Sequence, residues 1–236
     1  RAKPDLALRQ LVTQHRHGCW ILILSNAAIQ RWFEKHDVRC VIAGSVAAGI
    51  QLPSRDHDQR AVCRHAAGML LGLGHRRLAL IITRSELAGD LESAAGFVEG
   101  VQVSRHPEAT AEVCWHDGTV PGICNAMRRL YARDDPPTGL LVANAFHHLT
   151  VMGMLNQLGR RIPREVSVIS RDGEAYMDYE VPVPTRYEAK PQQFARSLLE
   201  VVNANLLGLH VSRPYLRVMP RFVRGETIAA PRPGSP

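Results

Sequence analysis

Several polar residues in this 236-residue chain each follow a short apolar run that has the length of a β-strand. They are Asn144 after Gly139–Ala143, Asp172 after Val166–Ser170, Ser45 after Val38–Ala43, and Arg84 after Arg77–Thr83. In an open parallel sheet, the loops at the carboxyl ends of the strands line a shared crevice, so we expect these side chains to converge on one ligand site. An amide and a carboxylate can both hydrogen-bond vicinal hydroxyl groups, which favours a hydroxyl-rich ligand.

Two of these residues also have a purely structural interpretation. Asn144 can close an Asx-turn with its side-chain oxygen, and Asp172 can cap a loop with its carboxylate. The sequence leaves both alternatives open.

The patterns of common catalytic and cofactor sites are missing from the sequence. Gly72-Leu73-Gly74 resembles the start of a dinucleotide fingerprint, but it follows a helix, whereas phosphate binding needs the glycines to open one. There is no Gly-x-Ser-x-Gly elbow and no Walker loop. Among the 11 histidines, the adjacent His147 and His148 diverge, and His65 and His75 lack a carboxylate at ligand spacing. We therefore expect a protein that is not an enzyme and holds no metal or cofactor.

The composition narrows the class further. Apolar residues make up 45% and charged residues 22%, as in globular proteins. The net charge of +7 favours polyanionic neighbours, but the basic residues are dispersed and aromatics are only 6%, so a basic solvated surface is preferred over direct nucleic-acid contact. No apolar run approaches the roughly 20 residues of a membrane span, and no export signal is visible. Five cysteines without a Cys-x-x-Cys pair favour reduced thiols in the cytoplasm.

Helix-like and strand-like segments alternate along the chain. The expected helices are 5–16, a segment around Ile29–Phe33, 59–73, 92–102, 149–158 and 191–207. The expected strands are 19–24, 38–43, 77–83, 139–143, 166–170 and 215–224. All-apolar runs such as Cys19–Leu24 are typical of strands buried on both faces, so the pattern predicts an α/β protein with parallel sheets covered by helices on both faces.

The ends of these helices carry recognisable caps. Ser25 or Asn26 is expected to cap the helix around Ile29–Phe33, and Asp58 the helix 59–73. Gly72 and Gly74, at the end of that helix, suit a left-handed C-terminal cap, which needs residues without a Cβ. The Pro-rich tail Ala229–Pro236 is expected to have little order.

Four stretches resemble, in the right order, the LacI/GalR family of bacterial transcription regulators. The first runs from Asp58 to Ile81 and contains Leu-Gly-His-Arg-Arg before a strand. The others are Ser93-Ala-Ala-Gly-Phe97, Pro137-Thr-Gly-Leu-Leu-Val-Ala-Asn144 and Gly159-Arg-Arg-Ile-Pro-Arg-Glu-Val-Ser-Val-Ile-Ser-Arg-Asp172. The resemblance covers about residues 20 to 228. The phrases Ile29-Gln-Arg-Trp-Phe33, Ile169-Ser-Arg-Asp172 and Pro220-Arg-Phe-Val-Arg-Gly-Glu-Thr227 look closer to a subgroup with a GntR-type winged-helix headpiece.

The resemblance implies a type I periplasmic-binding-protein-like fold, in which two parallel-sheet lobes hold a small sugar or sugar derivative between them. It implies an N-terminal lobe of residues 1–74 plus 184–209 and a C-terminal lobe of 75–183 plus 210–236. The first strand and helix of the N-terminal lobe, and the DNA-binding headpiece, would then lie outside this chain.

The same resemblance implies partners and a mechanism. We expect a cytoplasmic homodimer in which the effector shifts the population of lobe arrangements and so controls operator DNA binding by the headpiece. Candidates for the dimer face, or for ordinary lobe core, are Ile29, Trp32, Phe33, Val62 and Met69. Two other interpretations stay open, namely a periplasmic-type sugar-binding protein of a transport system and a sensor that dimerises but binds nothing.

The sequence departs from the family at the ligand positions that the resemblance implies. Ser93 stands where the family has a sugar-clamping Arg, with Asp90 one turn earlier, and Arg171 stands where it has an aromatic residue before the Asp. Gly44-Ser45 and Ala145 replace two family aspartates. Arg171 is able to pair with a ligand carboxylate or phosphate, or with Asp172 or Glu174. The candidate ligand-binding residues are therefore Asn144, Asp172, Arg171, Ser45, Arg84, Asp90 and Ser93, and the identity of the effector stays open.

Overall fold

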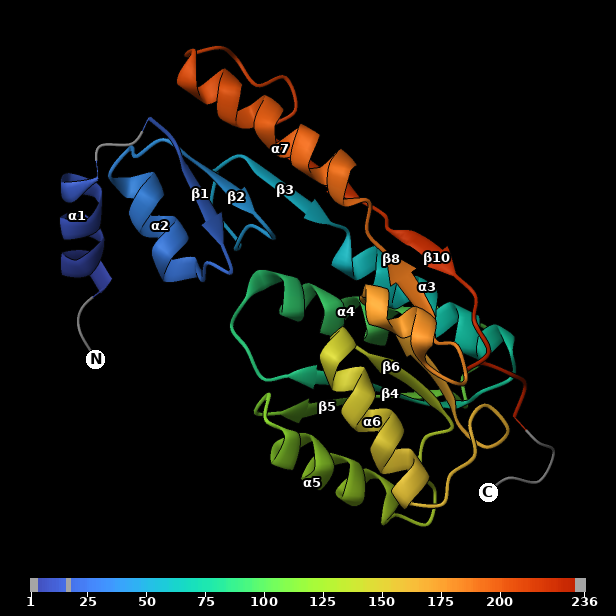
Figure 1. Ribbon diagram of the computed structural model, residues 1–236. Coiled ribbons are helices and arrows are strands. Elements are labelled where there is room, and N and C mark those ends of the chain that lie inside the picture. The colour runs from blue at the N-terminus through green and yellow to red at the C-terminus, as the bar shows by residue number, and fades with distance from the viewer. Residues whose placement is uncertain (1–3, 16–17, 232–236) are drawn as a thin grey trace. The chain divides into compact units, whose positions relative to one another are not determined.

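A computed structural model of the chain describes residues 4–15 and 18–231 and divides into two compact units, each described by itself below (Figure 1). Unit 1 consists of Arg1–Asp58, Glu86–Leu91 and Lys190–Val218. Unit 2 consists of Gln59–Ser85, Glu92–Ala189 and Met219–Pro236. Each unit is therefore assembled from segments that lie far apart in the sequence.

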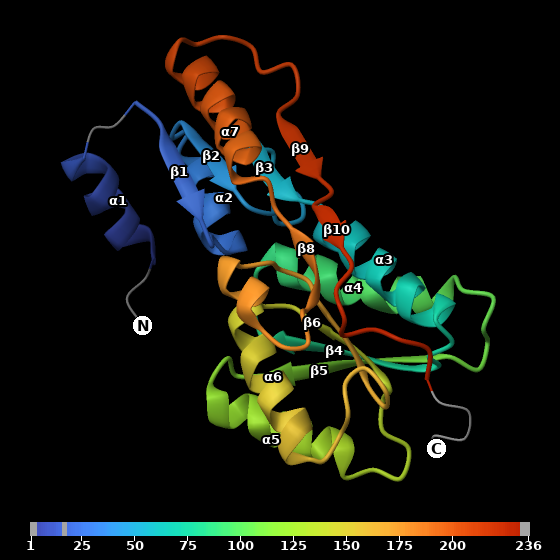
Figure 2. The same ribbon diagram turned by 45° about the vertical axis from the view of Figure 1, so that its right-hand side comes forward.

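Unit 1 is built on a four-stranded parallel sheet in the order β1-β2-β3-β9. The strands are β1 (Trp20–Ile23), β2 (Cys40–Ala43), β3 (Ser54–His57) and β9 (Tyr215–Val218), and the helices are α1 (Pro4–Gln14), α2 (Ala27–Lys35) and α7 (Pro191–Leu206). Trp32 and Phe33 of α2 pack in one apolar cluster with Leu22 and Ile42 of the sheet. Helix α7 contacts β2 and β3, and Figure 2 shows it across the sheet from α2. The buried positions of Trp32 and Phe33 show that they form core and not a dimer face.

Strand β1 differs from the expected doubly buried strand, because it lies at the edge of its sheet. Its side chains alternate between the two faces. Leu22 is buried against α2, but Ile21 is 43% exposed and Ile23 is 70% exposed. The prediction of burial on both faces is therefore wrong for this strand, since helix α7 covers β2 and β3 instead.

Unit 2 is built on a six-stranded sheet in the order β10-β8-β7-β6-β4-β5, in which only the edge strand β10 runs antiparallel to its neighbour. The strands are β4 (Arg77–Thr83), β5 (Thr110–His116), β6 (Gly139–Val142), β7 (Ser167–Ser170), β8 (Thr185–Glu188) and β10 (Arg221–Val223). The helices are α3 (Gln59–Gly72), α4 (Ala88–Gln102), α5 (Val120–Tyr131), α6 (Ala145–Gln157) and the 3₁₀ helix η1 (Ala175–Tyr179).

Helices cover both faces of this sheet. Leu78, Leu80 and Ile82 of β4 pack in one cluster with α3 and α4, while Ala79 and Ile81 pack in another with α5 and α6. Figure 1 shows the two helix pairs on opposite sides of the sheet. A strand buried on both faces tolerates only apolar side chains, so replacing Leu80 by Ala is expected to cost about 2–5 kcal/mol. The predicted α/β class, with parallel sheets covered on both faces, is confirmed.

Two glycines allow α3 and α4 to approach closely. A Cβ on Gly96 would lie 2.2 Å from the backbone oxygen of Arg60, and one on Gly100 would lie 2.9 Å from that of Arg64. Arg60 then reaches across the contact, with its Nε 2.8 Å from a carboxylate oxygen of Glu99. The glycine of the stretch Ser93-Ala-Ala-Gly-Phe97 is therefore required by helix packing.

The histidine of the Leu-Gly-His-Arg-Arg stretch holds the segment around Ala229 in place. His75 is buried, with Nδ1 3.0 Å from Thr138 Oγ1 and Nε2 3.0 Å from the carbonyl oxygen of Ala229. Gly74 before it adopts φ +103°, so the predicted left-handed cap is confirmed at Gly74, whereas Gly72 is the last residue of α3 and has no positive φ. Ala229 also bonds Ser167 through its backbone N–H, so the start of the Pro-rich tail is ordered, and residues 232–236 lie outside the described part.

Several element boundaries differ from the prediction for identifiable reasons. Helix α6 begins at Ala145 because Asn144 caps it, and α4 begins at Ala88. The stretch 215–224 forms two strands in two different sheets, β9 and β10. Strand β3 escaped prediction because its sequence, Ser-Arg-Asp-His, carries no apolar residue. The earliest helix ends at Gln14, and residue 16 of the predicted range lies outside the described residues.

The division into units also differs from the expected lobes at four places. Residues Glu86–Leu91, with the first turn of α4, belong to unit 1. Helix α3 belongs to unit 2, because its apolar face packs on β4 and β6. Strand β8 belongs to unit 2 because it pairs with β7. Strand β9 belongs to unit 1 because it pairs with β3.

Candidate functional site

The carboxyl edge of the unit 2 sheet gathers polar residues from neighbouring strands. Val142 of β6 lies opposite Ser170 of β7, so Asn144 and Asp172, each two residues further on, follow adjacent strands at the same edge. Strand β4 lies on the other side of β6 and ends at Thr83, just before Arg84. The parallel register therefore brings Asn144, Asp172 and Arg84 to one edge of one sheet.

Asn144 has the structural role that the sequence left open. Its side-chain oxygen accepts hydrogen bonds from the backbone N–H groups of Phe146, at 2.9 Å, and His147, at 3.2 Å. Asn144 is thus the N-cap of α6, and this satisfies two backbone donors that a helix leaves unpaired. The side-chain oxygen is occupied, and the amide nitrogen is the group that remains for a ligand.

Asp172 and Arg171 form an ion pair at the end of β7. Arg171 Nε and Nη2 each lie 3.3 Å from a carboxylate oxygen of Asp172. The Arg171 side chain is only 11% exposed, whereas that of Asp172 is 39% exposed. The Asp172 carboxylate is thus paired with a buried guanidinium on one side and is exposed to solvent on the other.

Ser93 completes this group. It is fully buried on α4, and its hydroxyl accepts a hydrogen bond of 2.8 Å from Arg171 Nη1. The backbone before it is fixed as well, because Ser170 Oγ donates to the carbonyl oxygen of Asp172 at 2.6 Å. Asp172 and Ser93 therefore both help to hold Arg171, and the pairing with Asp172 that the sequence left open is present.

The remaining predicted residues, Ser45 and Asp90, belong to unit 1. Ser45 follows β2, and its hydroxyl donates a hydrogen bond to the carboxylate of Asp56. Asp90 lies in the first turn of α4, one turn before Ser93. The structure thus places two predicted site residues in unit 1 and the other five in unit 2.

Asp56 is a polar residue of unit 1 that the sequence reasoning missed. It lies in β3, and its carboxylate accepts a 2.7 Å hydrogen bond from the backbone N–H of His57. Burial raises its pKa, and the hydrogen bond from Ser45 opposes that rise. Asp56 was missed because β3 has no apolar residue, so the apolar pattern did not identify the strand that holds it.

Gln30 positions the loops around Ser45. It is fully buried on α2, and its amide nitrogen donates to the carbonyl oxygens of Ser25, at 3.0 Å, and Ser45, at 3.1 Å. Its amide oxygen accepts from the backbone N–H of Ala47 at 2.8 Å. One side chain thereby joins the loops that follow β1 and β2.

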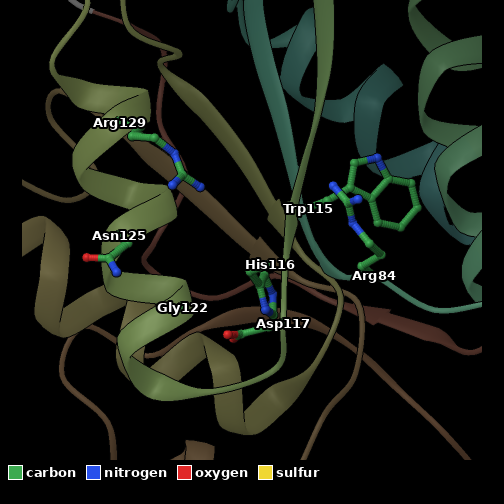
Figure 3. A pocket seen from close by; sticks show the side chains of 7 residues that line it. All are labelled: Arg84, Trp115, His116, Asp117, Gly122, Asn125 and Arg129. Atoms are coloured by element: carbon green, nitrogen blue, oxygen red, sulfur yellow. The ribbon is translucent and has the colours of Figure 1, made fainter.

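Arg84 lies in a hollow of about 290 Å³ at the ends of β4 and β5 (Figure 3). The other lining residues are Trp115, His116, Asp117, Gly122, Asn125 and Arg129. Burial and the neighbouring His147 lower the pKa of His116 to about 4, so its ring is neutral at physiological pH. None of Asn144, Arg171, Asp172 or Ser93 lines this hollow.

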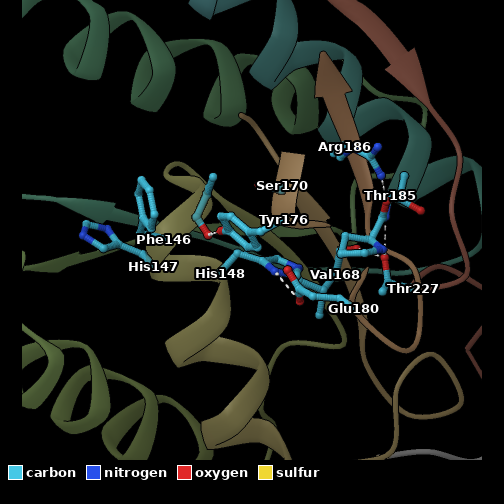
Figure 4. Close-up of polar contacts among 12 residues, drawn as sticks. Phe146, His147, His148, Val168, Ser170, Tyr176, Glu180, Thr185, Arg186 and Thr227 are labelled. Carbon is cyan, nitrogen blue, oxygen red and sulfur yellow. Dashed lines mark hydrogen bonds and ion pairs between the residues drawn. The ribbon is translucent and has the colours of Figure 1, made fainter. Parts of the chain in front are cut away.

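The segment around η1 is fixed against α6 beside this edge (Figure 4). The Tyr176 hydroxyl donates to the backbone oxygen of Ala145, and the buried His148 lies with Nδ1 3.4 Å from a carboxylate oxygen of Glu180. Arg186 of β8 reaches Asp178 at 2.5 Å. These contacts hold a short loop whose exposed residues include the apolar side chains of Tyr179 and Val181.

Residues 4–15 and 18–231 contain neither a metal site nor a membrane-spanning helix. No group of three or more His, Cys, Asp or Glu side chains is arranged to hold a metal ion there. In that same part of the chain, every helix is too short or too polar to cross a membrane.

Proteins similar to this chain include transcription regulators. The sequence model of the periplasmic binding protein-like domain matches residues 52–228. The HTH-type transcriptional regulator reg1 of Streptomyces lividans is 28% identical over 202 residues, which are 81% of this chain and 56% of that protein. The match covers 45%, 56% and 62% of the lengths of the regulators CelR, reg1 and MalR, so this chain spans about half the length of these relatives.

Solved structures share the fold at low sequence identity. A LacI family transcriptional regulator from Bifidobacterium animalis subsp. lactis superposes with a TM-score of 0.84 at 16% identity, over 98% of this chain and 85% of that one. A LacI family regulator from Enterococcus faecium with bound ribose gives a TM-score of 0.79 at 18% identity, over 97% of this chain and 85% of that one. The resemblance to LacI/GalR regulators seen in the sequence is confirmed.

Proposed function

The chain belongs to the family of periplasmic binding protein-like domains, and we propose that it is the effector-sensing domain of a LacI-type regulator that binds a sugar-like ligand at the carboxyl edge of the unit 2 sheet. The observation that carries the proposal is the group formed by Asp172, Arg171 and Ser93 beside Asn144. A half-exposed carboxylate with a fixed guanidinium behind it accepts hydrogen bonds from ligand hydroxyls without reorganising.

The charge of this group favours a sugar derivative over a plain sugar. Asp172 and the amide nitrogen of Asn144 supply an acceptor and a donor for hydroxyl groups. Arg171 shares its guanidinium between Asp172 and Ser93, and a ligand carboxylate or phosphate is a stronger acceptor for it than the Ser93 hydroxyl.

The relatives with a sensing domain of this kind act on DNA, and the Enterococcus faecium neighbour binds ribose. We extend both properties to this chain as proposals. The ligand changes the populations of two arrangements of the domain, and this alters how a DNA-binding headpiece meets its operator in the cytoplasm. A difference in ligand affinity between the two arrangements is the only source of energy that the mechanism needs.

The proposed regulator is a homodimer, and unit 2 offers a surface for it. Phe146 and Leu149 of α6 are exposed apolar residues, as are Tyr179, at 89%, and Val181, at 94%, on the neighbouring segment. Tyr176 and Glu180 of that segment contact Ala145 and His148 of α6, so the four exposed side chains flank one contact. We call Phe146, Leu149, Tyr179 and Val181 the α6–η1 patch. Exposed apolar groups of this kind mark interaction sites.

The test of ligand binding is a thermal-shift screen of pentoses, hexoses, sugar acids and sugar phosphates. A ligand at 100 times its Kd stabilises the folded chain by about 2.7 kcal/mol, which gives a clear rise in melting temperature. Asp172→Ala is expected to abolish the rise, whereas Asp134→Ala, which removes an exposed carboxylate at the end of α5, leaves it intact. Unchanged affinity in Asp172→Ala would show that the site is misplaced.

A further inference from the structure

The hollow at the ends of β4 and β5 is built to attract an anion. It lies entirely within unit 2, with Arg84 from the loop after β4, three consecutive residues from the end of β5, and Gly122, Asn125 and Arg129 from α5 (Figure 3). The three helical residues are spaced by three and four positions, so they share one face of α5. The volume of about 290 Å³ suits a small metabolite.

Two arginines of this hollow have no competing partner. Within the described residues, the guanidinium groups of Arg84 and Arg129 make no hydrogen bond and no ion pair. The nearby carboxylate of Glu112 is already taken, because Arg133 Nη1 and Nη2 lie 2.5 and 3.0 Å from its two oxygens. Both guanidinium groups are therefore available for an oxyanion, which the planar donor geometry of arginine recognises with two parallel hydrogen bonds.

The other polar groups leave this positive character in place. Asp117 is the only carboxylate among the lining residues, and one of its oxygens accepts from both the backbone N–H and the hydroxyl of Thr119. The amide oxygen of Asn125 accepts from Arg128 Nη1 at 3.1 Å, which leaves the amide nitrogen as a third donor. Two cations, one carboxylate and a neutral imidazole give the hollow a net charge of +1.

We propose that this hollow is a second ligand site, distinct from the group of Asn144, Asp172, Arg171 and Ser93, and that it binds a small metabolite with a phosphate group. Arg84 and Arg129 hold the phosphate oxygens, and the amide nitrogen of Asn125 donates to the same group. A phosphate dianion matches two guanidinium groups in charge, whereas a carboxylate matches one. Trp115 forms the apolar wall against which the carbon skeleton packs.

The test is calorimetric titration of the chain with glycerol 3-phosphate at low ionic strength, with glycerol and glycerate as the uncharged and carboxylate comparisons. The proposal expects binding of glycerol 3-phosphate and a loss of at least 10-fold in affinity for Arg84→Gln and for Arg129→Gln. Charge-assisted hydrogen bonds of this type contribute about 1.5–3 kcal/mol, and 1.4 kcal/mol is a factor of ten. Arg164→Gln, at an exposed arginine before β7, is the matched control and retains full affinity.

The outcome also separates this site from the effector site. Asp172→Ala is expected to leave glycerol 3-phosphate affinity unchanged, so a loss there would place the anion at the β6–β7 edge and overturn the proposal. Absence of binding, equal binding of glycerate, or full affinity in both Arg84→Gln and Arg129→Gln would overturn it as well. Far-ultraviolet circular dichroism of each variant excludes misfolding, and Arg129→Lys, which keeps the charge but loses the planar donor geometry, gives a second test with an intermediate affinity expected.

Discussion

Arg171 Nη1 donates a 2.8 Å hydrogen bond to the hydroxyl of Ser93 and thereby joins the end of β7 to helix α4. In the stretches that resemble LacI/GalR regulators, the family carries arginine at the position of Ser93 and an aromatic residue at the position of Arg171. The guanidinium of this protein thus comes from the strand and not from the helix. Its partners include the Ser93 hydroxyl and the carboxylate of Asp172, so a cation is present at this edge but is supplied by a different element.

Arg171 is expected to set the preference for charged ligands. Arg171→Gln should lower the affinity for sugar acids or sugar phosphates by about 10-fold or more, because it removes a charge-assisted hydrogen bond, and change the affinity for neutral sugars far less. Titration calorimetry with a matched pair, such as gluconate and glucose, checks this difference. An equal loss of affinity for both ligands would contradict this prediction and would mean that Arg171 acts only by holding Asp172 in place.

Two substitutions at Asn144 distinguish its role as the cap of α6 from a role in ligand binding. Asn144→Ala removes the side-chain cap of α6 and is expected to cost about 1 kcal/mol of unfolding free energy. Asn144→Asp keeps the capping oxygen and adds a charge that the helix N-terminus favours, so its stability should equal or exceed the original. Its ligand affinity should still fall, since the amide donor is gone. Urea unfolding and ligand titration of the two variants measure both effects, and undiminished affinity in Asn144→Asp would remove Asn144 from the ligand site.

Gln30 is expected to be important for the stability of unit 1. Gln30→Ala leaves the carbonyl oxygen of Ser45 and the backbone N–H of Ala47 without this partner and creates a small cavity. The expected loss of unfolding free energy is about 2–4 kcal/mol. Gln157→Ala, at an exposed position near the end of α6, is the control and should stay within about 0.5 kcal/mol. Chemical denaturation of the three proteins decides the matter, and a small effect in Gln30→Ala would contradict the assigned role.

Stability should fall in mild acid. The pKa of His116 is lowered to about 4 in the folded chain, against about 6.5 when unfolded, so the unfolded state binds the extra proton first as the pH decreases. The stabilising contribution is complete above about pH 6.5 and is lost progressively as the pH falls toward 4. Between pH 7 and pH 5 the expected decrease is up to about 2 kcal/mol for this one group. Burial also lowers the pKa of His75, which acts in the same direction.

The measurement for this prediction is urea unfolding at pH 7 and pH 5, compared with His116→Gln. The variant should show a smaller difference between the two pH values. His210→Gln, at an exposed histidine after α7, serves as the control and should behave like the original chain. A pH dependence that is identical in His116→Gln would contradict the assignment.

The α6–η1 patch is expected to hold the dimer together. Val181→Glu and Tyr179→Glu place a charge in an apolar contact and should convert a dimer to a monomer in light scattering, since an unpaired buried charge is costly. Both side chains are almost fully exposed within the chain, so the fold should survive. Val103→Glu, at an exposed valine just after α4, is the matched control. A chain that stays dimeric in both patch variants would place the interface elsewhere.

Strands β4, β6 and β7 of unit 2 were accessible from sequence because both faces of the sheet are covered there, whereas β5, β8 and helix α5 were not predicted. Strand β4 occupies Arg77–Thr83 as expected, since every residue inside it must be apolar. Strand β3 was not accessible, because Arg55 and Asp56 satisfy their polar groups inside the structure. Arg55 alone donates to the carbonyl oxygens of Ser54, Arg213 and Pro214. A one-dimensional apolar pattern carries no information about such distant partners.

The candidate site shows the same limit. Asn144 and Asp172 could be placed at one sheet edge because parallel register follows from the fold class. The contact between Arg171 and Ser93 could not be placed, because the two residues are far apart in the sequence and neither belongs to a spacing rule. The proposed anion site around Arg84 and Arg129 requires arginines whose guanidinium groups are available. The sequence does not show which arginines these are, because it does not show that Glu112 pairs with Arg133.

The pairing of β3 with β9 has a consequence for synthesis on the ribosome. Ser54 lies opposite Tyr215, so the strand that completes the first sheet is translated about 160 residues after the strand it joins. Most of the polypeptide must emerge before that open edge is closed. The nascent chain therefore presents an unpaired β-strand for much of its translation, and this edge is where chaperones would engage it and where misassociation between neighbouring nascent chains would begin.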